Sequence, residues 1–166
     1  VVSAAAGPEY NLEELRYSTY LGGNGTERIC DTALGPDGSI YVAGWTNSFF
    51  FPITPGAYKT QFSQYGNSYL TRFSPSGEQL VYSTFVSDST DFMCESLAIA
   101  PDGSAYLAGS SNPSFDTTPG VYDPAVETND AAVIRISPDG SRLIFATQVS
   151  GAGGGAQIGR ATVDAQ

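Results

Sequence analysis

The sequence predicts an all-β protein built from repeated four-stranded units. Three observations support this prediction. A strand-like segment recurs three times along the 166 residues, short runs rich in β-branched and aromatic residues are separated by Gly and Pro turn signals, and helix signals are nearly absent. A fixed period of tens of residues is typical of proteins in which one supersecondary unit is repeated.

The period is about 64 residues. The segment Leu-Arg-Tyr-Ser-Thr-Tyr-Leu around Tyr17 returns as Leu-Val-Tyr-Ser-Thr-Phe-Val around Tyr82 and as Leu-Ile-Phe-Ala-Thr-Gln-Val around Phe145, at intervals of 65 and 63 residues. Pro-Asp-Gly-Ser at Pro36 and Pro101 keeps the same step. A drift of one or two residues is expected where loop lengths vary and the strands do not.

The repeat divides into strands in a regular order. The first full unit is expected to hold strands at 29–34, 40–46, 69–73 and 80–85, and the second at 96–100, 105–109, 132–136 and 143–148. Single flanking strands are expected at 15–21 and 158–163. Pro-Asp-Gly turns favour tight antiparallel hairpins, whereas the link of about 20 residues between second and third strands is long enough to carry variable contacts.

Four antiparallel strands with this period are typical of a β-propeller blade. We therefore expect an N-terminal extension at 1–14 and a partial β-propeller at 15–166, with blade units at about 24–86 and 87–149 and a third beginning within 150–166. Ten strands do not divide into blades. We expect a fragment of a chain longer than roughly 250 residues, or part of a larger assembly, with an unstacked blade face exposed.

Four motifs resemble the SBBP-type β-propeller repeat of large secreted bacterial proteins. They are Tyr-Ser-Thr-Tyr-Leu-Gly-Gly from Tyr17, Pro-Asp-Gly-Ser-Ile-Tyr-Val-Ala-Gly from Pro36, Phe-Pro-Ile-Thr-Pro-Gly-Ala-Tyr from Phe51, and Phe-Ser-Pro-Ser-Gly from Phe73. The resemblance implies a propeller in an extracellular setting and carries over no catalytic residue. The usual acidic, glycine-rich loop after the first motif is replaced here at 24–30 and 87–91.

Composition narrows the function classes. Seven basic and 17 acidic residues give a net charge of −10, which disfavours nucleic acid and anionic membranes as partners. No apolar run approaches the roughly 20 residues of a membrane-spanning helix, so membrane insertion is not expected. The absence of histidine excludes Ser-His-Asp and Cys-His catalysis within these residues. Only 14% of residues are charged, which favours an extracellular or cell-surface location over the cytosol.

Aromatic residues that recur between units are expected to serve packing, and those that do not recur are candidates for binding. Phe49, Phe50 and Trp45 align with Pro113, Ser114 and Ser110. The simpler expectation is that Phe49 and Phe50 pack under their own loop; the alternative is that a partner covers them. Trp45 ends a strand, where core packing is the commoner role. The recurring aromatics, expected to pack, are Phe51 with Phe115 and Tyr58 with Tyr122.

Cys30 and Cys94 lie 64 residues apart, in similar parts of successive units. A disulfide, two buried thiols, or two chemically idle cysteines all fit the sequence. Asp88 and Asp91 lack the spacing of an EF-hand loop, so a solvated acidic loop is the better interpretation, and neither a metal site nor a cofactor is expected.

The function hypothesis is a noncatalytic structural or protein-binding propeller scaffold of an exported or cell-surface bacterial protein. Its partners would be another protein, or further blades of the same or another chain. The alternative is a carbohydrate-binding propeller, in which Trp45 would stack on a glycan between blades.

Overall fold

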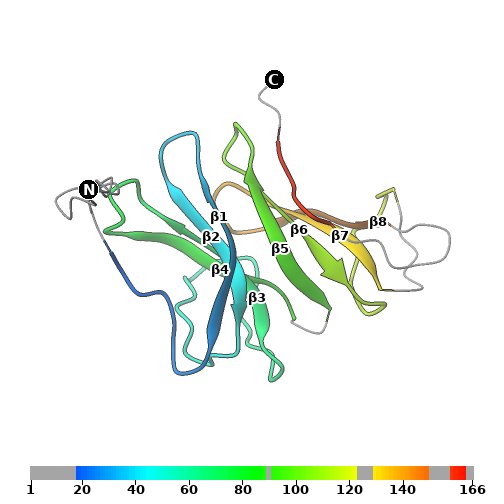
Figure 1. Cartoon of the computed structure of the whole chain (residues 1–166), viewed down its shortest axis with the longest axis horizontal. Helices are drawn as coiled ribbons and strands as arrows, with labels where there is room; N and C mark the ends of the chain where they lie inside the picture. Colours follow the sequence, from blue (N-terminus) through cyan, green and yellow to red (C-terminus); the bar gives the residue numbers. More distant parts are fainter. Residues whose placement is uncertain (1–17, 89–90, 123–128, 150–157, 164–166) are drawn as a thin grey trace, which may run out of the picture.

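The computed structural model describes residues 18–88, 91–122, 129–149 and 158–163. These residues form two four-stranded antiparallel sheets and no helix (Figure 1). The first sheet contains β1 (Glu27–Leu34), β2 (Ile40–Thr46), β3 (Asn67–Phe73) and β4 (Leu80–Asp88), and the second contains β5 (Phe92–Ile99), β6 (Ala105–Ser111), β7 (Asp130–Ile136) and β8 (Leu143–Val149). Strands follow chain order in each sheet, which confirms the predicted all-β units of four strands.

The two predicted flanking strands are not present as strands in the described residues. Residues 18–21 and 158–163 carry no strand assignment. Residues 15–17 of the first predicted strand and the predicted extension at 1–14 lie outside the described residues. The segment 158–163 nevertheless runs beside β5 (Figure 1), where the backbone N–H of Ala161 donates to Ser96 Oγ at 3.0 Å. A side-chain contact replaces the backbone ladder that would define a strand.

The Pro-Asp-Gly turns form the expected tight hairpins. Gly38 and Gly103 take φ of 81° and 82°, a left-handed conformation that glycine adopts without steric cost. The preceding aspartates accept hydrogen bonds from the backbone N–H two residues on, at Ser39 (3.1 Å) and Ser104 (2.9 Å). These local bonds fix the register of β1 with β2 and of β5 with β6.

The sheets stack face to face, with the main core between them. One face of the first sheet buries Tyr41, Leu70 and Tyr82, and the facing surface of the second buries Leu107 and Ile134. Alternation of side chains along each strand places these residues on a single face. The opposite face of the first sheet has its own core, formed by Val42, Phe51, Tyr69 and Phe85.

Polar contacts lock the two sheets in one relative position. The Tyr41 hydroxyl donates to the Gly103 carbonyl at 3.1 Å, and Arg72 Nη1 donates to the Pro138 carbonyl at 3.0 Å. Both acceptors lie in hairpin turns of the second sheet. The side chains that donate these hydrogen bonds belong to β2 and β3, so the turns of one sheet are held by the face of the other.

The long link between second and third strands runs along the outer strand of its own sheet. The backbone N–H of Thr54 donates to the Ser83 carbonyl on β4 at 3.0 Å, and Thr118 donates to Ala146 on β8 at 2.9 Å. The Thr hydroxyls at these positions accept hydrogen bonds from the same two strand residues. Each link therefore satisfies backbone groups that the edge of the sheet would otherwise leave open.

The predicted packing residues are only partly confirmed. Phe51 and Phe115 are buried, as expected. Tyr58 is half-buried against the main core, but Tyr122 at the matching position is 90% exposed, so its expected packing role is wrong. The reason is the second sheet, because the Tyr58 backbone N–H donates to the Gly140 carbonyl at 2.8 Å and no described segment covers Tyr122 in that way.

Candidate binding site between the sheets

A hollow of about 350 Å³ opens between the two sheets near their first strands. Three strands supply its walls: β1, β2 and β5. The lining residues are Arg28, Ile29, Cys30, Trp45, Met93 and Cys94. Ile29 and Met93 are 61% and 54% exposed, so the rim is apolar and open to solvent. An open apolar hollow with one aromatic wall and one cationic residue suits a small ligand that has both apolar and polar groups.

Trp45 forms the aromatic wall because of its place in the sheet. It pairs with Arg28 on β1 and with Ser68 on β3, and its side chain is half-buried. A Cβ at Gly66 would lie 2.9 Å from the indole ring, so only glycine leaves room for the ring there. Trp45 is thus neither a fully buried core residue nor a free surface side chain.

The matching position in the second sheet shows what Trp45 adds. Ser110 occupies that position, and a hollow of about 230 Å³ lies beside it, lined also by Phe92, Met93 and Asn112. The aromatic wall is therefore particular to the first unit. Because the second unit folds with serine at this position, the shared fold of the repeat does not require a tryptophan there.

A disulfide forms the floor of the larger hollow. The structure bridges Cys30 on β1 and Cys94 on β5, with Cα atoms 6.2 Å apart. In the chain-entropy treatment, closing a loop of 64 residues stabilises the fold by about 4 kcal/mol. The bridge also holds the two walls of the hollow together, and it fits an oxidising setting.

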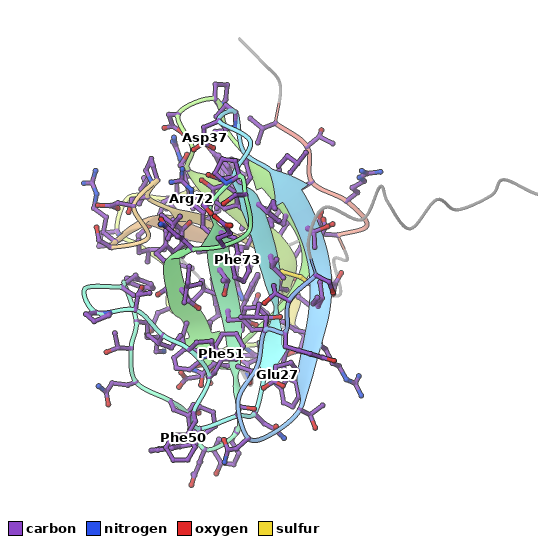
Figure 2. The ribbon with its side chains drawn as sticks, turned by 90° about the vertical axis from the view of Figure 1, so that its left-hand side faces the viewer. Glu27, Asp37, Phe50, Phe51, Arg72 and Phe73 are labelled. Atoms are coloured by element: carbon purple, nitrogen blue, oxygen red, sulfur yellow. A yellow bond between two sulfur atoms is a disulfide. The ribbon has the colours of Figure 1, made fainter. Side chains whose placement is uncertain are left out.

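Phe49 and Phe50 lie away from the hollow, in the link after β2. They are 65% and 70% exposed, so the expectation that they pack under their own loop is wrong. Their neighbour Phe51 takes the buried position, and Figure 2 shows Phe50 at the end of the molecule, below Phe51. The Phe49 ring meets Phe50 edge-on at 5.1 Å and Phe62 at 5.7 Å, which forms a small aromatic surface of Phe49, Phe50 and Phe62.

Two repeated clusters were missed by the sequence analysis. Arg72 pairs with Asp37 at 2.7 Å beside the first turn (Figure 2), and Arg135 pairs with Asp102 at 2.8 Å in the second unit. Hydrogen bonds from Ser39 hold the pKa of Asp37 below its usual value, and Arg72 adds to the effect. The available signal was an arginine 33 to 35 residues after each turn aspartate.

The sequence-predicted residues therefore fall into two places. Trp45, Cys30 and Cys94 meet at the hollow, whereas Phe49 and Phe50 form a separate surface. In the described parts of the chain, no helix is long and apolar enough to cross a membrane, and no three acidic, cysteine or histidine side chains gather as metal ligands.

Comparison with known proteins adds no family. No family model matches the sequence, and no curated protein matches it.

Proposed function

We propose that this chain forms consecutive blades of a β-propeller of the SBBP type and acts as a noncatalytic scaffold in an exported bacterial protein. One observation carries the proposal. Asp31 Oδ2 on β1 accepts from the Leu97 backbone N–H on β5 at 2.9 Å, and Ser96 on β5 accepts from Ala161 at 3.0 Å. The same joint between successive innermost segments occurs twice, and its bonded residues lie 66 and 65 positions apart in the sequence, which supports regular stacking around an axis.

The disulfide and the composition support the proposed compartment. A bridge such as Cys30–Cys94 persists in oxidising compartments and is rare in the cytosol. The low content of charged residues is consistent with export. A secreted or cell-surface location is therefore part of the proposal.

The scaffold is tested by the intact mass and low-resolution shape of the protein isolated from its source. A ring-shaped particle with a mass several times 17.4 kDa is the expected result. A compact particle near 17.4 kDa that contains two sheets would contradict the propeller.

The aromatic surface of Phe49, Phe50 and Phe62 is the proposed site for a protein partner. Exposed apolar area of this kind is costly in water and gains free energy when a partner covers it. A variant with both Phe49→Ser and Phe50→Ser should keep its stability. When it is immobilised, it should no longer retain the protein partner that the unmodified protein retains. Tyr20→Ser, which alters an exposed aromatic residue outside this surface, is the control. Equal retention by both variants would remove this site from the proposal.

A second function is favoured by the hollow at Trp45. Aromatic rings that line open hollows stack on the apolar faces of sugars, and Arg28 could bind a hydroxyl or an acidic group beside the ring. A glycan array probed with the protein should show signals that Trp45→Ala abolishes and Trp45→Phe largely keeps. An array without signals would leave the protein-binding scaffold as the function.

A further inference from the structure

We infer that the outer face of the second sheet, built around Tyr106, Arg135 and Phe145, docks a third four-stranded sheet whose innermost segment is 158–163. The inference rests on the proposed scaffold function and names the partner of one of its surfaces. The first sheet binds two hairpin turns of the second sheet. The same binding residues recur on the second sheet, so its partner must present turns of the same kind.

The first sheet shows the socket when it is filled. The Arg72 guanidinium lies 5.3 Å from the centroid of the Tyr41 ring, and the Tyr82 ring meets Tyr41 edge-on at 6.3 Å. The Tyr41 hydroxyl and Arg72 donate to the carbonyls of Gly103 and Pro138. Tyr41 and Tyr82 are buried by this contact. We call this arrangement of tyrosine, arginine and second aromatic ring the turn socket.

The second sheet repeats the turn socket. Arg135 lies 5.0 Å from the centroid of the Tyr106 ring and pairs with Asp102 at 2.8 Å, and the Phe145 ring meets Tyr106 at 6.1 Å. Here Tyr106, Arg135 and Phe145 are all half-buried. The donors and rings are already in position, and no described segment presents a turn to them. The same chemistry is therefore available for a further pair of turns.

The contacts in the filled socket also determine which turn sequences fit. A Cβ at Gly140 would lie 2.4 Å from the Tyr82 ring, so the turn that meets the second aromatic ring must present glycine. The Gly140 carbonyl accepts from the Tyr58 backbone N–H, whereas Tyr122 at the matching position is exposed. The partner must therefore present a Pro-x-Gly turn to Phe145 and a Pro-Asp-Gly turn to Tyr106.

The place of 158–163 decides between a third sheet and a second copy. Ala161 bonds to Ser96 in the way that Leu97 bonds to Asp31, so this segment holds the innermost position of the next unit. Val163 lies beside Pro101 and Ile99 around a hollow of about 320 Å³. A second copy that docked its first sheet here would have to place its β1 where 158–163 already lies. The partner is therefore a sheet that includes 158–163.

Hydroxyl-radical labelling of the protein isolated from its source, read by mass spectrometry, tests the inference. Tyr20 is fully exposed and sets the unprotected rate, while Tyr41 and Tyr82 set the rate of a filled socket. We expect Tyr106 and Phe145 to be labelled on the order of tenfold more slowly than Tyr20, because a docked sheet admits the radical only on local opening.

The outcomes separate the inference from the stacking of the two sheets on which the proposed scaffold depends. Fast labelling of Tyr106 with Tyr41 protected would overturn the third sheet and leave the stacked pair intact. Fast labelling of both tyrosines would overturn the stacking on which the scaffold depends. Protection of Tyr106 that accompanies cross-links between two copies of 1–166 would identify a second copy and also overturn the inference.

A matched pair of variants gives a second measure in the same protein. Arg72→Ala and Arg135→Ala each remove one ion pair and one contact with a tyrosine ring, and only Arg72 has a described bond to a turn carbonyl of the next sheet. Equal losses in the urea midpoint are expected if both sockets are filled. A clearly smaller loss for Arg135→Ala would count against the third sheet.

Discussion

Replacing Gly140 by alanine tests the joint between the sheets directly. Gly140 has φ of 71°, and an added Cβ would lie 2.4 Å from the Tyr82 ring. The left-handed backbone alone costs alanine about 1 kcal/mol, and forcing a methyl group into a packed contact costs a further ~1–3 kcal/mol. We therefore expect Gly140→Ala to lower the free energy of unfolding by about 2–4 kcal/mol.

Gly120→Ala is the matched control, since Gly120 has φ of 81° and an added Cβ there would meet nothing within 4 Å. It carries the backbone cost without the steric one, so a loss of about 1 kcal/mol is expected. Urea unfolding with the disulfide intact measures both variants. Equal losses would refute the described contact between Gly140 and Tyr82. Combining Gly140→Ala with Tyr82→Leu should recover at least about 1 kcal/mol of the loss, because the two sites touch.

Three other predictions concern the core. Reduction of Cys30–Cys94, or the double serine variant, should lower the free energy of unfolding by about 4 kcal/mol, and an unchanged urea midpoint would show that the bridge does not form. Tyr82→Phe should leave stability unchanged or raise it by about 1 kcal/mol, because the buried Tyr82 hydroxyl has no hydrogen-bond partner within the described residues; a loss above this size, measured by thermal unfolding, would reveal a missed partner. Burial raises the pKa of Tyr82 and raises that of Tyr69 to about 12, so stability should be full below pH 10 and fall above it as the unfolded tyrosines ionise; a flat profile to pH 12 in urea titrations would contradict that burial.

The repeat made the sheets predictable, but the innermost strands were predicted less well. The predicted strand at 40–46 coincides with β2, because Ile40 to Thr46 combine β-branched and aromatic residues between clear turn signals. In contrast, β5 begins at Phe92, four residues before the predicted 96. A register shift between Cys94 and Ser96 breaks the alternation that a sequence pattern needs, because Ser96 and Leu97 are adjacent and both buried.

The sequence identified residues of the candidate site, but it did not show where in the fold the site would form. Trp45 and the cysteines were noticed for their chemistry, yet the hollow arises only when β1, β2 and β5 from two sheets come together. Phe49 and Phe50 were expected to be covered. A run of three phenylalanines cannot turn every ring toward one side of a chain, and Phe51 takes the inward position.

The hydrogen bonds of Thr54 with β4 and of Thr118 with β8 should reduce aggregation at high protein concentration. A bare outer strand is a template on which another chain can add by main-chain pairing, which is the usual first step of edge-to-edge aggregation. Here the link in each unit covers that strand, and both links carry the sequence Thr-Pro-Gly, from Thr54 and from Thr118. Units can thus be repeated along a chain without adding open strand edges on which another chain could pair.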